Sequence, residues 1–346
     1  MSLDRSAGST LASALALLMV FAGACGPRSQ PLRDTLPPHV GSTSPYVQGD
    51  ASGPANAPRI DVEASADEAD ALALPGAADA DLAGCGASGS IMYLLADTGV
   101  IRTFDPVLVP TGSPFRTLGP LACKLADGTP WTRPGDIAID RAGVVWINAS
   151  VGNLFRWDPS NATCTQTPLA AGQSGFTNMG MTFVGSADGT ETLLVDDNAN
   201  GPLSNGGQGL ATIDLVTFRL TLLANFGAPL TGRVAELAGT ADGRVYGFFY
   251  GPDSWIAEID PSNGAVLWST QVPVSLVGSG PTHVTVAAAL WEHVLYFFVT
   301  NTAVAPSADV YGFDLTTRQT TPLLSQIGFN VTGAVVHTCG ATPSAG

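Results

Sequence analysis

Short runs of apolar residues, separated by turns that contain glycine, recur through most of the chain after residue 90. In one stretch, apolar residues at 235–240 and 244–249 flank Asp242-Gly243, a dipeptide that strongly favours a tight β-hairpin. A third run ends in a hydrophobic residue followed by Asp260, and a more polar fourth run comes next. The pattern predicts units of four antiparallel strands, because each run is short and the turns between runs are tight.

The same order of strands repeats five times. A hydrophobic residue followed by Asp closes the third strand of each unit, at intervals of 46 to 56 residues. The five aspartates are Asp105, Asp158, Asp214, Asp260 and Asp314. Four-stranded units at a period of about 50 residues indicate a β-propeller in which each unit is one blade. We expect each Asp to accept hydrogen bonds from amides of the following turn rather than to bind a metal.

The first unit lacks a strand on its N-terminal side. Its expected strands lie at residues 92–95, 100–104 and 115–118. Near the other end of the chain, residues 332–338 form an apolar run that belongs to none of the other four-stranded units. Antiparallel pairing of 332–338 with 92–95 would close the ring and remove an exposed sheet edge. We therefore predict an all-β fold, a propeller of five four-stranded blades whose C-terminal strand closes the first blade. Six blades are the alternative, with further strands within residues 198–209.

An uncharged apolar run at residues 11–24 stands directly before Cys25. The run is too short to span a bilayer, which needs about 20 residues, and is typical of a signal peptide. We expect residues 1–24 to be removed and Cys25 to carry a lipid, although Ala22 stands where a lipoprotein signal usually has Leu. An ordinary signal peptide cut nearby is the alternative. Gly26 rather than Asp after the cysteine favours the outer membrane.

Residues 25–84 are rich in Pro, Ala, Ser and Asp, with Tyr46 as their one aromatic residue. Such a segment cannot bury enough apolar surface to offset the entropy lost on ordering. We expect a disordered acidic tether that holds the propeller about 40 Å from its anchor. A further domain of unusual composition is the alternative. The propeller domain is expected at residues 85–341, with a tail at 342–346.

The chain is acidic throughout. Its net charge is −15, and residues 26–84 and 86–346 each hold more acidic than basic residues. This charge disfavours nucleic acid as a partner. Lys124 is the one lysine of the chain, and no Gly-rich nucleotide-binding motif occurs. We expect no cofactor and a monomeric protein.

Four cysteines besides Cys25 fall within the expected propeller. They are Cys85, Cys123, Cys164 and Cys339. An exported chain meets oxidising conditions, and four cysteines allow three pairings. Cys339 ends the strand that completes the first blade and Cys85 precedes its neighbour, so we pair these two. Cys123 and Cys164 then follow or lie in the outer strands of the first two blades and form the second disulfide. The spacings do not suggest a metal or redox site.

Two carboxylic acids and two histidines are candidates for a site in the central channel. Asp136 and Glu236 stand at the starts of inner strands, where five-bladed glycosidases carry paired carboxylates. Those enzymes have a third carboxylate, but the blade between offers Asn178. His283 opens one inner strand and His337 ends another, so both could approach the channel and hold a metal. Packing or solvation of single histidines is the simpler interpretation.

Asp196, Asp197, Asn198 and Asn200 form an oxygen-rich cluster. Alternating oxygen ligands suit calcium, but the spacing matches no calcium loop and no closing Glu follows. We therefore expect a solvated loop. Aromatic residues gather on the second strands of the blades, where they are expected to form the core between neighbouring sheets.

Several segments resemble a group of uncharacterised myxobacterial lipoproteins. They lie at residues 172–177, 180–183, 235–244 and 333–339. The resemblance covers residues 90–340, cysteines included, while residues 25–84 match in composition alone. Residues 259–264 are also similar to repeats of quinoprotein and other propellers. Neither resemblance implies an activity or a catalytic residue.

These observations favour a non-catalytic binding or interaction module, anchored to the outer membrane on its periplasmic or cell-surface face. Such a module would hold a protein or carbohydrate on one face or in the central opening of the propeller. The alternative is an extracellular hydrolase or lactonase with a metal or a carboxylate pair in the channel. An enzyme is expected to place two carboxylates, or a carboxylate and a histidine, within about 6 Å around a pocket. The fold alone does not decide, because propellers host unrelated functions.

Overall fold

The computed structural model describes most of the expected propeller. The described residues are 91–131, 133–198, 206–274, 276, 284–301 and 307–338. The expected signal peptide, the expected lipidation site Cys25, the expected tether, Cys85, Cys339 and His283 lie outside them.

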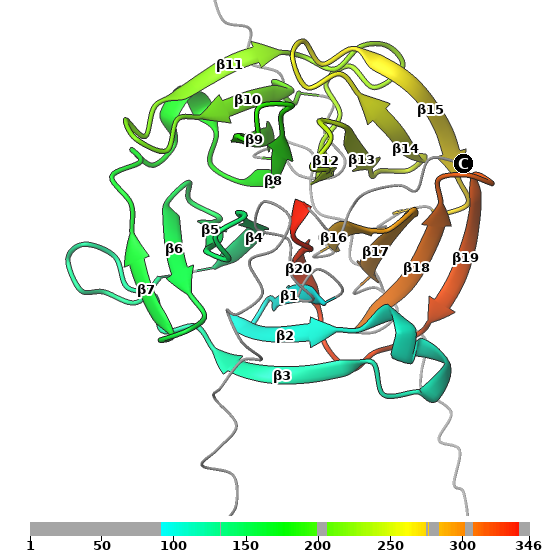
Figure 1. Cartoon of the computed structure of the whole chain (residues 1–346), viewed down its shortest axis with the longest axis horizontal. Coiled ribbons are helices and arrows are strands. Elements are labelled where there is room, and N and C mark those ends of the chain that lie inside the picture. Colours follow the sequence, from blue (N-terminus) through cyan, green and yellow to red (C-terminus); the bar gives the residue numbers. More distant parts are fainter. Residues whose placement is uncertain are drawn as a thin grey trace, which may run out of the picture. The chain divides into compact units, whose positions relative to one another are not determined.

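Five four-stranded antiparallel sheets form a ring, with one strand of each sheet at its centre (Figure 1). Blade 1 consists of β20 (Val331–Val335), β1 (Met92–Ala96), β2 (Val100–Phe104) and β3 (Phe115–Pro120). Blade 2 consists of β4 (Pro134–Ile139), β5 (Val145–Ala149), β6 (Leu154–Asp158) and β7 (Thr163–Gln166). Blade 3 consists of β8 (Met179–Gly185), β9 (Glu191–Asp197), β10 (Leu210–Ile213) and β11 (Leu220–Ala224). Blade 4 consists of β12 (Ala235–Gly239), β13 (Val245–Phe249), β14 (Ser254–Ile259) and β15 (Val266–Val272). Blade 5 consists of β16 (Val284–Trp291), β17 (Val294–Asn301), β18 (Ala308–Asp314) and β19 (Gln319–Leu324).

The predicted fold class is therefore confirmed, with five blades and not six. The inner strands β4, β8, β12, β16 and β20 lie around the centre in Figure 1, and the outer strands follow the rim. In the described part of the chain, the 3₁₀ segments η3 (Pro106–Thr111) and η4 (Gln173–Gly175) lie in the connections between β2 and β3 and between β7 and β8. Within the described ranges, no helix has the length and apolar character needed to cross a membrane.

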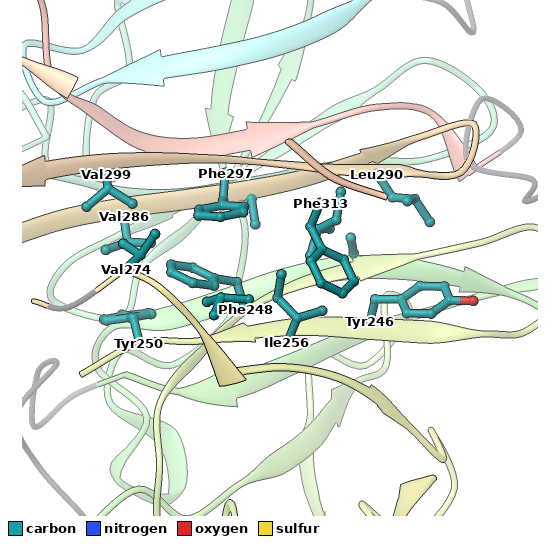
Figure 2. Packing of buried hydrophobic residues seen from close by; sticks show 14 of the residues in the cluster. Tyr246, Phe248, Tyr250, Ile256, Val274, Val286, Leu290, Phe297, Val299 and Phe313 are labelled. Atoms are coloured by element: carbon teal, nitrogen blue, oxygen red, sulfur yellow. The ribbon is translucent and has the colours of Figure 1, made fainter. Parts of the chain in front are cut away.

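The core lies between neighbouring sheets, because both faces of the inner and second strands are covered. Every residue of β13 is buried, which leaves no solvent face on that strand. Figure 2 shows the packing of blade 4 against blade 5. There the ring of Phe248 stacks on that of Phe297, with centroids 4.5 Å apart. The aromatic residues of the second strands thus form the expected core, and burying each such ring stabilises the fold by roughly 1.5 to 3 kcal/mol.

Ring closure follows the predicted pairing. β20 pairs antiparallel with β1, so that Tyr93 lies opposite Val335 and Leu95 opposite Gly333. The side chain of Thr332 adds a hydrogen bond from its hydroxyl to the carbonyl oxygen of Leu95 at 3.2 Å. The first blade is therefore built from both ends of the described domain, and its β1 is an interior strand rather than an exposed edge.

The five repeated aspartates all cap the turns that follow their strands. In each case Oδ1 accepts the backbone N–H of the residue two positions further on, at N···O distances of 2.8 to 3.0 Å. The expected structural role is thus confirmed. These hydrogen bonds, together with those from neighbouring side chains in the same turns, hold the pKa of Asp158, Asp214, Asp260 and Asp314 below the usual value for aspartate.

One of the two predicted disulfides lies within the described residues, and it is confirmed. Cys123, which follows β3, is bonded to Cys164 in β7. The bond therefore ties the segment that leaves blade 1 to the outermost strand of blade 2. The Cys85–Cys339 pairing stays a prediction.

Candidate functional site

A pocket of about 370 Å³ opens where the inner strands begin. All five inner strands contribute to its wall, since each starts at this end of the ring. Its lining residues are Asp97, Arg133, Pro134, Gly135, Asp136, Ser150, Asn178, Met179, Asn198, Glu236, Tyr250, Val284, Thr285, Val286, Asn330 and Thr332. Most of these residues have polar side chains, and groups from different blades converge on one space.

Further along the inner strands the channel narrows to apolar walls. A second gap, of about 10 Å³, is lined by later residues of β12, β16 and β20, among them Leu237, Ala289 and Val335. Such a gap holds about one water molecule. Of these two spaces, the pocket at the start of the inner strands is the one large enough for a small molecule.

Asp136 lines the pocket and also bridges neighbouring blades. It is 3% exposed, and its Oδ2 accepts the backbone N–H of Met181 in β8 at 2.6 Å. On its other side lies β20, where a Cβ on Gly333 would come within 2.7 Å of Oδ1. Glycine at that position is what lets the carboxyl fit between the strands. The Oδ1 atom is itself buried and has no hydrogen bond within the described ranges.

Glu236 lines the same pocket but is held much more weakly. It is 5% exposed, and the hydrogen bond found for its carboxyl is a long one, from Asn198 Nδ2 to Oε1 at 3.4 Å. The same Asn198 amide nitrogen donates its shorter hydrogen bond to the carbonyl oxygen of Ala235, at 3.0 Å. Glu236 is therefore a buried carboxyl at the pocket wall with hydrogen-bonding capacity to spare.

A third carboxyl, Asp196, lies behind the pocket wall. It is fully buried, and its Oδ2 accepts the N–H of Ala235 in β12 at 2.8 Å. Its Oδ1 fills the space next to Gly180 that a Cβ would otherwise occupy. The third carboxyl therefore comes from the second strand β9, whereas Asn178 directly precedes the inner strand β8 of that blade.

The expectation of a solvated loop at residues 196–198 is wrong. Asp196 and Asp197 are the last residues of β9, and these two and Asn198 are 0%, 2% and 3% exposed. Two of them accept hydrogen bonds from the inner strand of the next blade. The backbone N–H of Ala235 donates to the side-chain oxygens of both Asp196 and Asn198. The available sequence signal was their position directly after the apolar run of β9. Asn200 lies outside the described residues.

Burial and mutual repulsion favour the protonated form of all three carboxyls. Burial raises the pKa of Glu236 well above its ordinary value, and the nearby Asp136 and Asp196 raise it further. Burial also raises the pKa of Asp136 and of Asp196 well above the usual aspartate value, although backbone N–H groups oppose this shift. Burial and the same three acids raise the pKa of the Tyr250 hydroxyl. The structure thus brings together two of the predicted channel residues and Asp196, which the sequence analysis had placed in a solvated loop.

His337 lies at the other end of the channel. It follows β20, whose first residues line the pocket, and it is close enough to Asp140, which follows β4, for that acid to oppose its shift. Burial is the larger effect and lowers the pKa of His337. His337 is therefore not brought together with Asp136 and Glu236. Across the part of the chain that the structure describes, no three His, Cys, Asp or Glu side chains form a group able to hold a metal ion.

Comparisons with known proteins identify similar folds at low similarity. No family model and no curated protein match the chain. Among solved structures, it is similar to the extracellular domain of a one component system from B. thetaiotaomicron, at 18% identity and a TM-score of 0.34. That match covers 70% of this chain but 28% of the other. It is also similar to apo AztD from Citrobacter koseri, at 15% identity, a TM-score of 0.33 and coverage of 71% and 61%. The Dos1 propeller matches at 12% identity, a TM-score of 0.38 and coverage of 72% and 71%. No ligand or activity follows from these likenesses.

Proposed function

We propose that this protein is an exported, lipid-anchored propeller that binds a small polar ligand in the channel pocket without chemically changing it. The observation that carries the proposal is the pocket itself. Its volume of about 370 Å³ falls in the range of small-molecule sites, and polar side chains from all parts of the ring converge on it. A carbohydrate, one of the two ligand classes expected from the sequence beside a protein, and other small polar molecules fit this description.

The geometry favours binding over hydrolysis. A glycosidase-type mechanism needs two carboxyls that both reach the substrate or its attacking water. Here Oδ2 of Asp136 is occupied by the N–H of Met181, and Oδ1 is buried between strands. Glu236 is thus the one carboxyl of this group with free capacity at the pocket, and a general acid without an accessible partner does not complete that mechanism.

Filling the pocket is expected to abolish ligand binding. Ser150 lines the pocket and is partly exposed, so Ser150→Trp can place its ring in the opening without disturbing a buried strand. Thr165→Trp, on the exposed face of the outer strand β7, is the matched control. Ligand-observed NMR with a panel of monosaccharides, disaccharides and small amines should detect a compound that binds the wild type and the control but not Ser150→Trp.

Two outcomes would overturn this proposal. One is a panel in which no compound binds the wild type, or in which Ser150→Trp binds as the wild type does. The other is turnover of the bound compound by the wild type that is lost in Glu236→Gln, since this would show that the site is catalytic.

The anchor can be tested separately. Cys25→Ala is expected to release the protein from membranes into the soluble fraction, because the lipid alone is proposed to hold it there. Fractionation with metabolic labelling by a fatty acid measures both effects, and Ser29→Ala is the neighbouring control. Unchanged sedimentation with membranes would contradict the lipid anchor while leaving pocket binding untouched.

A further inference from the structure

The pocket region holds an excess of acidic groups. Four ion pairs are found in the described ranges, and none includes Asp136, Asp196 or Glu236. Arg133 is the one basic residue on the pocket wall, and it is exposed, as is Asp97. Three buried carboxyls therefore share this site without a buried positive charge beside them.

Each of the two aspartates leaves its Oδ1 atom buried without a hydrogen-bond partner in the described ranges, whereas Glu236 differs in having no short hydrogen bond on its carboxyl there. Asp136 and Asp196 each accept a short hydrogen bond from a backbone N–H of the following blade, at 2.6 and 2.8 Å. Glu236 is 5% exposed, and the hydrogen bond found for its carboxyl among the described residues is the long one from Asn198. Carboxyls of buried residues in native proteins normally accept good hydrogen bonds, and Glu236 lines the pocket, so a donor bound there would supply the short bond that this carboxyl does not receive from the described residues.

An aromatic residue, Tyr250, lines the same pocket and is near enough to Glu236 for that carboxyl to raise its pKa. Tyr250 lines the pocket directly after β13 and is 8% exposed. Its ring packs at a tilt of 30° on Phe248, with centroids 6.1 Å apart, and Figure 2 shows it at the end of the blade 4 core near Val274. Packing therefore fixes the ring in place. A carboxyl next to an ordered aromatic ring is a common arrangement for holding an organic cation.

We propose that the ligand carries an alkylammonium or guanidinium head whose N–H groups bind the Glu236 carboxyl. This inference rests on the proposed function, because it assumes that the pocket holds a ligand. An organic cation supplies both missing features, a hydrogen-bond donor and a positive charge, through N–H···O bonds that are stronger than neutral ones. A metal ion fits less well, since no group of three metal-binding side chains occurs among the described residues.

Binding of such a cation should release a proton. In the empty pocket, burial and the neighbouring acids raise the pKa of Glu236, so it holds its proton to higher pH than an exposed glutamate. A cation beside it favours the charged form and lowers that pKa. The other titratable groups facing this site are Asp136 of β4, Asp196 of β9 and Tyr250, with Arg133 and Asp97 farther out on the wall.

The test uses n-butylammonium, with butyramide as the neutral and butyrate as the anionic analogue. Calorimetry between pH 5 and pH 8 should find that the ammonium binds and the analogues do not. Its affinity should rise with pH, by up to about tenfold per pH unit where one proton is released for each cation bound. Titration in buffers of different ionisation enthalpy counts those protons directly.

Glu236→Gln should remove the pH dependence and weaken n-butylammonium binding by at least about tenfold, the effect of losing one charge-assisted hydrogen bond. Glu292→Gln, in the exposed turn between β16 and β17, makes the same chemical change away from the pocket and should bind as the wild type. Glu236→Gln should fold. A carboxyl with a raised pKa stabilises the folded state at low pH and loses that effect as pH rises, so the neutral amide should hold its stability better at pH 8.

The outcomes separate this inference from the proposed function. If neutral compounds bind in the pocket and n-butylammonium does not, the pocket is a ligand site but the cation assignment is wrong. If n-butylammonium binds equally to Ser150→Trp, both proposals fail. Tighter binding of Ca²⁺ than of n-butylammonium, with loss in Glu236→Gln, would also overturn the organic-cation assignment.

Discussion

Ending the chain after Asn330 is expected to abolish cooperative folding of the propeller. The truncation removes β20, and with it the buried side chains of Val331, Val335 and Val336. Burial of three valines contributes about 5 to 9 kcal/mol, which is comparable with the total stability of about 5 to 15 kcal/mol of a typical domain. The inner edge of β1 would also lose its hydrogen-bonding partner. Thermal unfolding followed by circular dichroism and by hydrogen exchange measures the loss.

A chain that ends after Thr338 is the matched control, because it keeps β20 complete and should unfold cooperatively. If the chain that ends after Asn330 unfolded in one sharp transition at the temperature of this control, ring closure by β20 would be unnecessary for the fold. The control also removes Cys339, so a difference between it and the full chain under oxidising conditions would support the predicted Cys85–Cys339 disulfide.

Removing the Cys123–Cys164 disulfide should destabilise the domain by up to about 4 kcal/mol. The bond closes a loop with a sequence separation of 41 residues, and the chain-entropy relation for that length gives this upper value. Replacing both cysteines by alanine avoids a free thiol at Cys123, which is 2% exposed. Urea unfolding of the double variant and of the wild type gives the difference in free energy of unfolding.

A reducing agent provides the control for this measurement. It should bring the wild type close to the double variant, whereas the variant itself should respond only through the predicted Cys85–Cys339 bond. Equal stability of the oxidised wild type and the double variant would mean that the bond does not constrain the unfolded chain. Non-reducing peptide mapping identifies which cysteines are joined in each sample.

The strands and their order could be predicted from the sequence because their signals are local and repeated. The apolar runs expected at residues 235–240 and 244–249 correspond to β12 (Ala235–Gly239) and β13 (Val245–Phe249). The aspartate at the end of each third strand fixed the period, since a turn needs a cap wherever that strand ends. Ring closure followed from one missing strand and one spare strand, a relation that needs no knowledge of side-chain packing.

The candidate site could be predicted only in part, because its side chains are placed by contacts between blades. The position of Asp136 and Glu236 at the starts of inner strands was enough to place them at the channel. The burial of Asp196 was not predictable in this way, since Asp-Asp-Asn after a strand is typical of an exposed turn. Its burial depends on the N–H of Ala235 and on the missing side chain of Gly180, which lie in other strands.

The polar bridges between blades also limit how this protein can change by recombination. Asp136 of blade 2 accepts a hydrogen bond from the backbone N–H of Met181 in blade 3. Asp196 of blade 3 accepts one from the backbone N–H of Ala235 in blade 4. A propeller whose blades contacted one another through apolar faces alone could gain or lose a unit by duplication. Here a replacement for the third blade would need a side chain like that of Asp196, which accepts the N–H of Ala235 in blade 4. It would also need a glycine like Gly180, because a Cβ there would clash with that carboxyl. We therefore expect blades 2, 3 and 4 to be exchangeable as one segment rather than as three separate modules.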